Sequence, residues 1–344
     1  MVSMIYLVNV EFQFNIILQA RRIRVRKNSL YLSCLLFLFL IFLTFCSPER
    51  GDMEKRPAEG EINFSTLKAQ FPFRGKIVFQ SDMDGDNEIY LMTEFKLRKL
   101  TDNHWDDEYP RWSPDGTRVA FAANPHGHFD VFFMNEDGSD ITRLTNFPGD
   151  ETEPAWVPHA QEIVFTRETK NGWGRHFSLW KLDLEARKFG RLLPEFENSH
   201  GLAQFSPAAP LMLFTGKRMF GWDVFIHDFR TDESRSLTKG GRSCRAYFSP
   251  DGQTVAYVTS EADGKGDIWT MKPDGTEKTK LTERDETYDY FPSWSPDGKY
   301  IVFCSSFQDT PRKGPWSIFV VKVSTKSVFL LFASSGRDLF PDWK

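Results

Sequence analysis

The chain has 344 residues, with 43 Lys and Arg against 47 Asp and Glu, and its formal net charge of −4 excludes a broad basic surface for nucleic acid. Four cysteines are too few for a disulfide framework in a chain of this length. Hydrophobic residues make up 40% of the chain and aromatic residues 15%, which is enough apolar material for a large packed core.

The N-terminus has the pattern of an export signal. Five basic residues lie between Arg21 and Lys27, and the apolar run Leu30–Phe45 follows. The run is shorter than the roughly 20 apolar residues that span a bilayer. Its end, Leu43-Thr-Phe-Cys46-Ser, resembles a bacterial lipoprotein signal and predicts lipidation of Cys46, with an uncleaved anchor or an ordinary signal peptide as the alternatives.

These features divide the N-terminal part of the chain into two segments. We expect residues 1–46 to be an N-terminal extension with an export signal or anchor, and residues 47–74 to be a polar tether. The protein is therefore predicted to be anchored to a membrane, in the periplasm or on the outer surface of the cell envelope.

A repeated phrase dominates the remainder of the chain. It is Tyr109-Pro-Arg-Trp-Ser-Pro-Asp-Gly116 in one copy and Phe291-Pro-Ser-Trp-Ser-Pro-Asp-Gly298 in another. The aromatic residue before each turn recurs at spacings of 44, 49, 43, 46 and 49 residues, a period typical of β-propeller blades. These aromatic residues are Trp112, Trp156, Phe205, Phe248, Trp294 and Trp343.

Each repeat predicts four strands, which we name a to d. In the second unit they are Tyr109–Ser113, Arg118–Ala122, Asp130–Met134 and Thr142–Thr145. The Ser-Pro-Asp-Gly turn suits a tight a–b connection, because proline presets φ, aspartate bonds nearby backbone and glycine supplies a positive φ. We expect the a–b and c–d turns on one face of the disc, and the b–c and d–a loops on the other.

The two ends of the repeat region complement each other. The first unit starts with a b strand, Lys76–Ser81, whereas the final Asp338–Trp343 is an a strand with no blade to follow. The prediction is an all-β, six-bladed propeller over residues 75–344, made of four-stranded antiparallel blades and closed by the C-terminal strand completing blade 1. Side chains expected to pack between blades are Trp112, Trp156, Trp294 and Trp343.

The repeat, with its Val-Ala-Phe and Asp-Ile-Trp-x-Met-x-x-Asp-Gly continuations, resembles the TolB-type propeller repeat, which also occurs in prolyl-oligopeptidase-like enzymes. The resemblance covers about residues 75–344 and implies an envelope partner, such as a peptidoglycan-associated lipoprotein. It does not extend to the α/β domain that precedes the propeller in TolB. Prolyl-oligopeptidase-like catalysis would need a Gly-x-Ser-x-Gly motif, and the sequence contains none.

Aromatic and arginine side chains are expected on the loop side of the disc. Such residues often anchor protein interfaces, although long loops also bury aromatic residues merely to stay folded. Both interpretations apply to Trp105, Trp173, Trp222, Tyr288 and Trp316, and to Arg218, Arg242, Arg245 and Arg284.

In four of the six predicted a strands an acidic residue stands three residues before the proline. At a channel mouth these carboxylates would hold a cation or a basic peptide, whereas the structural alternative is that each caps a turn through backbone N–H groups. The four are Asp107, Glu151, Asp289 and Asp338, with His200 and Ser243 at the matching positions of the other repeats.

Metal-binding signals are weak, and we expect no metal or other cofactor. His126 and His128 form the one close histidine pair, and Asp82–Glu88 lacks the glutamate that would complete a calcium loop, so it predicts a b–c hairpin loop. Cys244 and Cys304 fall in different blades and are not expected to form a disulfide.

The sequence favours a binding protein that performs no chemistry and presents its loop side and channel mouth to a protein or peptide in the envelope. The alternative is an enzyme acting on a glycan or peptide, with Asp107, Glu151 and Asp289 as acid, base or metal ligands. These carboxylates would then have to converge on a pocket.

Overall fold

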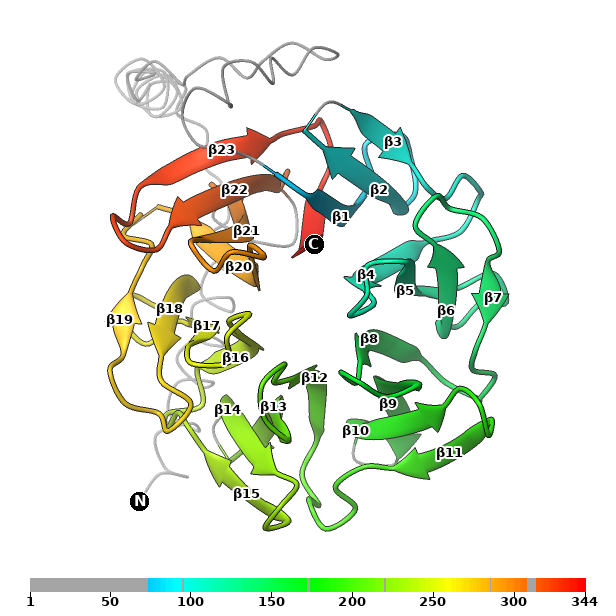
Figure 1. The fold of residues 1–344 in the computed structure, drawn as a ribbon, viewed down its shortest axis with the longest axis horizontal. Coiled ribbons are helices and arrows are strands. Elements are labelled where there is room, and N and C mark those ends of the chain that lie inside the picture. Colours follow the sequence, from blue (N-terminus) through cyan, green and yellow to red (C-terminus); the bar gives the residue numbers. More distant parts are fainter. Residues whose placement is uncertain (1–73, 95, 172–173, 220, 285, 308–313) are drawn as a thin grey trace, which may run out of the picture. The chain divides into compact units, whose positions relative to one another are not determined.

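In the computed structural model, the described residues form six four-stranded antiparallel sheets arranged around a central axis (Figure 1). The structure describes residues 74–94, 96–171, 174–219, 221–284, 286–307 and 314–344. The predicted all-β, six-bladed architecture is confirmed. Over these ranges the chain has no helix of the length and hydrophobicity needed to cross a bilayer.

Each blade runs from an inner strand beside the axis to an outer strand at the rim. Blade 1 consists of β24 (Asp338–Trp343), β1 (Lys76–Ser81), β2 (Glu88–Thr93) and β3 (Leu97–Lys99). Blade 2 consists of β4 (Asp107–Trp112), β5 (Arg118–Ala123), β6 (Asp130–Asn135) and β7 (Thr142–Arg143). Blade 3 consists of β8 (Glu151–Trp156), β9 (Glu162–Asn171), β10 (Gly174–Asp183) and β11 (Lys188–Arg191). Blade 4 consists of β12 (His200–Phe205), β13 (Leu211–Arg218), β14 (Gly221–Asp228) and β15 (Glu233–Ser236). Blade 5 consists of β16 (Ser243–Phe248), β17 (Val255–Thr259), β18 (Asp267–Met271) and β19 (Thr279–Lys280). Blade 6 consists of β20 (Tyr288–Trp294), β21 (Tyr300–Ser306), β22 (Ser317–Lys322) and β23 (Val328–Phe332).

Blade 1 is assembled from both ends of the propeller sequence. β24 pairs antiparallel with β1, with Ile77 opposite Trp343 and Ser81 opposite Asp338. The backbone N–H of Lys76 donates to the carbonyl of Lys344 at 2.6 Å, and a 2.8 Å bond returns from Lys344 to Lys76. The predicted closure by the C-terminal strand is therefore confirmed.

Six apolar clusters fill the junctions between neighbouring blades. The aromatic residue that ends each inner strand packs against the preceding blade. Two of the tryptophans also donate Nε1–H to a backbone carbonyl of that blade, Trp156 to Arg111 at 3.2 Å and Trp294 to Tyr247 at 3.1 Å. Trp343 instead donates to the carbonyl of Arg74 at 2.9 Å, just before β1 of its own blade. The repeat aromatics are thus junction residues, as the sequence predicted.

The a–b and c–d turns lie at one end of the blades, which we call the turn face, and the b–c and d–a loops lie at the other, the loop face. In the a–b turn of blade 2, the carboxylate of Asp115 accepts the hydroxyl of Ser113 at 2.5 Å and the backbone N–H of Thr117 at 3.0 Å. These bonds lower the pKa of Asp115 to about 2. Blades 5 and 6 repeat the arrangement with Asp251 and Asp297.

Every inner strand carries a β-bulge at the same position. Strand pairing shifts register between Glu108 and Arg111 in blade 2, and at the matching step in the other five blades. One non-glycine residue at each bulge has a φ between 53° and 58°, a left-handed conformation that costs roughly 1–2 kcal/mol. We call these residues the axial ring: Tyr109, Glu153, Leu202, Arg245, Phe291 and Phe340.

The junction role of the tryptophans predicts a large stability loss on truncation. Trp294→Ala removes a 7% exposed indole and its hydrogen bond, so the free energy of unfolding in urea should fall by about 3–5 kcal/mol. Trp105→Ala, at a 40% exposed position, is the control and should change it by about 0.5 kcal/mol or less. A loss below about 1 kcal/mol for Trp294→Ala would contradict the junction packing.

Candidate binding site

The axial ring brings one side chain from each blade to the propeller axis. The ring of Phe340 lies 3.9 Å from that of Phe291 and 4.5 Å from that of Tyr109, centroid to centroid. The guanidinium carbon of Arg245 lies 4.5 Å from the centre of the Phe291 ring. Part of the ring is therefore aromatic, and Arg245 stacks against that part.

A second layer lies two residues further along each inner strand, nearer the turn face. Arg111 of blade 2 donates to the hydroxyl of Tyr247 in blade 5 and lies 3.5 Å from the carboxylate of Asp342 in blade 1. Asp342 also accepts the backbone N–H of Trp112 at 2.8 Å and the hydroxyl of Ser293 at 2.9 Å. Burial lowers the pKa of Arg111, against the opposing charge of Asp342. These bonds link four blades across the axis.

The charged members of the axial ring are less completely bonded. Glu153 accepts the hydroxyl of Thr166 at 3.0 Å, and burial raises the pKa of its carboxyl against the opposing charge of Arg245. Arg245 Nε has no acceptor within hydrogen-bonding distance among the described residues, and its Nη1 has only the weak Cys244 Sγ acceptor at 3.4 Å. Because the inner strands start at the loop face, the axial ring is the layer nearer that face, and Arg245 retains donor capacity there.

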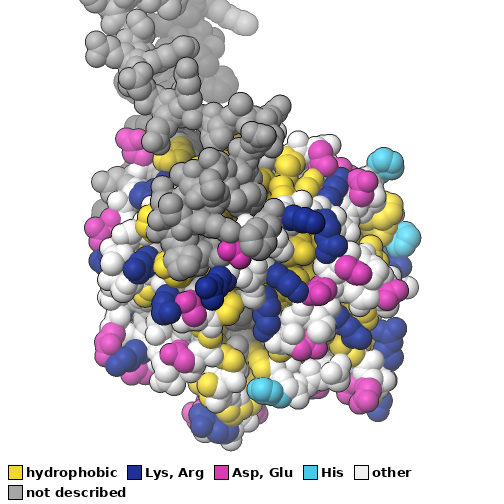
Figure 2. All heavy atoms as spheres, turned by 45° about the horizontal axis from the view of Figure 1, so that its top comes forward, with side chains coloured by type: hydrophobic (Ala, Val, Ile, Leu, Met, Phe, Trp, Pro, Cys, Tyr) yellow, Lys and Arg dark blue, Asp and Glu magenta, His cyan; other side chains and the backbone are white. Residues whose placement is uncertain are grey.

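Exposed hydrophobic residues on the loop face come from three different connections. Trp105 is 40% exposed, Met219 is 87% exposed and Phe307 is 65% exposed. Arg218 and Arg242 are exposed on the same face. Apolar side chains with neighbouring arginines are typical of protein interfaces. On the surface that Figure 2 presents, acidic and basic side chains are interspersed, so that view shows no field of a single sign.

The other predicted loop residues have different surroundings. Trp316 is only 4% exposed and lies 6.0 Å from Tyr290, ring centre to ring centre, so it is a packing residue. Trp222 and Tyr288 are half-buried, and Arg245 lies in the axial ring and not in a loop. Arg284 is largely covered and stacks on Phe319 at 4.4 Å. Trp173 and Cys46 fall outside the described residues.

The four in-register carboxylates are buried, and each has a hydrogen bond or ion pair with its own blade or with the loop leading to it. Asp338 accepts the hydroxyl of Ser81 at 2.6 Å and the backbone N–H of Ser334 at 2.8 Å. Asp107 accepts the amide of Asn103 at 2.7 Å. Ion pairs hold the other two: Glu151 lies 3.5 Å from Arg167, and Asp289 lies 3.9 Å from Arg284. Among the described residues, Asp338 accepts a backbone N–H as the structural interpretation requires, whereas neither carboxylate oxygen of Glu151 or of Asp289 has a hydrogen-bond partner.

Burial shifts the titration of these groups. It raises the pKa of Asp107 to about 7, with the nearby Glu88 charge adding to the effect, and that of Glu151 to about 7, with Asp130 adding. It also raises the pKa of Asp338 to about 6. Since a buried carboxyl group resists ionisation, a raised pKa here needs no catalytic explanation.

The weak metal signals have structural roles. Residues 82–87 connect β1 to β2, and Asp82 pairs with Arg337 at 2.7 Å, as expected for a hairpin loop. His126 is exposed, whereas His128 lies 3.6 Å from Asp130. In the part of the chain that the structure describes, no group of three or more His, Cys, Asp or Glu side chains is arranged to hold a metal ion.

Sequence reasoning missed the axial ring. Its members stand two residues after the acidic position and directly before the proline in Tyr109-Pro110, Glu153-Pro154, Phe291-Pro292 and Phe340-Pro341. A bulge repeated in every inner strand was the signal that would have identified them, because it turns this residue toward the axis.

Comparison with known proteins agrees with this geometry. A family model described as the TolB beta propeller domain (PD40) matches residues 96–240. Protein TolB homolog of Chlorobium luteolum is 30% identical over 213 residues, which are 60% of this chain and 47% of that protein. The crystal structure of TolB from Acinetobacter baumannii matches with a TM-score of 0.66 at 17% identity, covering 81% of this chain and 70% of that one.

Over the matched residues the propeller is similar to TolB-type propellers. Dipeptidyl-peptidase 5 of Porphyromonas endodontalis is also similar to this chain, at 25% identity over 230 residues, which are 62% of the chain and 31% of that enzyme. The chain thus spans about a third to a half of the length of these two sequence relatives.

Buried Asp107 predicts a dependence of stability on pH. Its pKa is about 7 in the folded state against 3.8 for an ordinary Asp, so between these values the folded state keeps a proton that the unfolded chain has released. The contribution of Asp107 to stability therefore falls as pH rises through this window. Asp107→Asn, which keeps an acceptor for Asn103, should stabilise the protein more at pH 8 than at pH 5.

Thermal unfolding of the wild type and Asp107→Asn at both pH values measures this difference. The matched control is Asp115→Asn, at an exposed turn whose pKa of about 2 lies below the range, so its effect should be the same at pH 5 and pH 8. An effect of Asp107→Asn that is equal at both pH values would contradict the burial of an ionisable carboxyl group at this position.

Proposed function

We propose that this TolB-like chain is a non-catalytic binding protein of the bacterial cell envelope that recognises a protein or peptide partner through its loop face and axial ring. The observation that carries the proposal is the combination of exposed Trp105, Met219 and Phe307 on the loop face with Arg245 at the axis, whose Nε has no acceptor among the described residues. A partner segment with an acidic group would cover the apolar side chains and pair with this guanidinium.

The buried carboxylates support a binding role over an enzymatic one. Catalysis by an acid–base pair needs carboxyl groups that face a substrate pocket, whereas Asp107, Glu151, Asp289 and Asp338 are at most 1% exposed. At the second layer, Arg111 crosses the axis to Tyr247 and occupies space that a substrate would need. The axis is therefore better suited to receive the tip of a partner than to enclose a reaction.

The family suggests which partner to consider. TolB-type propellers imply an envelope protein, such as a peptidoglycan-associated lipoprotein. Residues 1–46 add export, and a lipid on Cys46 or an uncleaved anchor would hold the propeller at a membrane. We therefore place the protein in the periplasm or on the outer surface of the envelope, tethered by residues 47–74.

Crosslinking in the native membrane tests the proposal. The variant Trp105→Ala/Met219→Ala/Phe307→Ala removes the exposed hydrophobic residues of the loop face, and we expect it to lose most of the specific product that the wild type captures. Interface anchors typically contribute 2 kcal/mol or more each, which corresponds to roughly a 30-fold change in affinity.

The control variant Leu97→Ala/Ile141→Ala removes exposed hydrophobic residues at c–d turns on the opposite face and should leave the product unchanged. Equal capture by the loop-face variant and the wild type would contradict the loop-face site. Turnover of a glycan or peptide by the purified wild type would contradict the non-catalytic role.

A further inference from the structure

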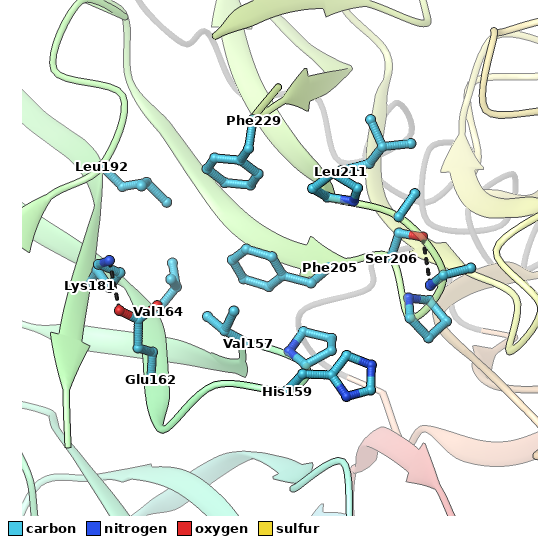
Figure 3. A pocket seen from close by; sticks show the side chains of 15 residues that line it. Val157, His159, Glu162, Val164, Lys181, Leu192, Phe205, Ser206, Leu211 and Phe229 are labelled. Carbon is cyan, nitrogen blue, oxygen red and sulfur yellow. Dashed lines mark hydrogen bonds and ion pairs between the residues drawn. The ribbon is translucent and has the colours of Figure 1, made fainter. Parts of the chain in front are cut away.

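A cavity of about 520 Å³ opens between blades 3 and 4 at the turn face, away from the proposed partner surface (Figure 3). Its walls include Phe205, Phe229, Leu192, Leu211 and Val157, and the turns that border it supply three prolines. Cavities of this size with mostly apolar walls are typical of small-molecule sites.

The cavity occurs at the junction that lacks a tryptophan. At each junction one of the two blades contributes two aromatic side chains. One is the last residue of that blade's inner strand, and the other is the third residue of the Asp-Ile-Trp-type segment in that blade's third strand. At the other five junctions at least one of these is tryptophan, whereas the described members of the cluster between blades 3 and 4 include Phe205 and Phe225 and no tryptophan. The other pairs are Trp112 with Phe132, Trp156 with Trp180, Phe248 with Trp269, Trp294 with Phe319, and Trp343 with Tyr90.

The turns at the same junction also depart from the repeat. At other junctions the Ser-Pro-Asp-Gly turn packs closely on its neighbour: a Cβ on Gly252 of blade 5 would lie 3.0 Å from the Cβ of Ala208 in blade 4. Blades 3 and 4 carry Val-Pro-His-Ala, ending at Ala160, and Ser-Pro-Ala-Ala, ending at Ala209, in place of that turn. Both turns line the cavity, so two independent departures from the repeat meet at one place.

The walls suit a flat apolar ring. The rings of Phe205 and Phe229 are nearly parallel, 12° apart, with centroids separated by 6.2 Å. Phe229 is 41% exposed, so one aromatic wall is open to solvent. The charged residues of the lining, Lys181 and Glu162, neutralise each other in an ion pair of 2.8 Å. An uncharged aromatic ligand therefore matches the site better than an anion or a cation.

We propose that this cavity, at the junction where the tryptophan of the repeat is absent, binds a planar aromatic ring of about the size of an indole. The nearly parallel rings of Phe205 and Phe229 form one aromatic wall of the site, and the prolines of the two turns enclose its edges. The ring belongs either to a free aromatic compound or to a tryptophan side chain presented by a peptide.

Calorimetric titration of the full chain with indole tests the proposal, and N-acetyltryptophanamide serves as the probe for a peptide-borne ring. We expect saturable one-site binding of indole with a dissociation constant of about 1 mM or tighter. Indole binding without N-acetyltryptophanamide binding supports a free-compound ligand, whereas binding of both supports a side chain. Absence of saturable binding of either probe would overturn the proposal.

Two variants locate the site. Phe205→Trp restores the residue of the repeat and fills part of the cavity, so it should weaken binding about threefold or more while the unfolding temperature stays equal to or above that of the wild type. Phe229→Ala removes the exposed wall and should weaken binding about threefold to tenfold. The matched control Phe189→Ala, at a 40% exposed phenylalanine of blade 3 outside the cavity, should bind as the wild type does.

The Phe229→Ala and Phe189→Ala pair keeps the test decisive if Phe205→Trp fails to fold. Binding that is equal in these two variants, or a folded Phe205→Trp protein that binds indole as tightly as the wild type does, would place the aromatic site elsewhere and overturn the assignment.

Discussion

The pairing of β24 with β1 is the constraint on which the rest of the structure depends. It joins the last seven residues of the chain to the first strand of the propeller, and so leaves no free inner edge in blade 1. The strand also brings Trp343 into the apolar cluster between blades 6 and 1. β24 also supplies Phe340 to the axial ring and Asp342 to the second layer. The strand that closes the propeller therefore also contributes to both layers at the axis.

The repeated bulge lets one residue of each inner strand vary without disturbing the residues that hold the blade together. Each inner strand turns one residue toward the axis at the same step, while its other side chains hold the blade. Any side chain can stand at that step, and this chain places three aromatic residues, a leucine, a glutamate and an arginine there. The second layer is tied across the axis by Arg111 and Asp342, whereas Arg245 above it keeps an uncommitted donor. Hydrogen bonds and an ion pair therefore hold the second layer together, whereas the axial ring keeps a donor that can bind a partner.

The sequence predicted the fold well because the blade repeat is a local pattern. Ser-Pro-Asp-Gly turns and alternating apolar strands each determine a hairpin, and the missing first strand indicated the closure by Asp338–Trp343. The site was harder, because it depends on contacts between blades. Arg245 was assigned to a loop, since Ser-Cys-Arg-Ala lacks the proline and the acidic residue that mark this step elsewhere, and the bulge instead places it at the axis. The burial of Trp316 and the inward orientation of Asp107 follow from packing against residues distant in the sequence. The phenylalanine at position 205 was visible as a departure from the repeat, but the cavity beside it was not.

Whether the axis takes part in recognition is best decided by the affinity of the crosslinked partner for the wild type, Arg245→Lys and Arg245→Gln. We expect Arg245→Gln to weaken binding about tenfold or more, and Arg245→Lys, which keeps the charge but not the planar donor geometry, to weaken it less. Unfolding temperatures of the three proteins separate this effect from loss of structure. Equal affinity for all three would contradict a role for the axis in binding.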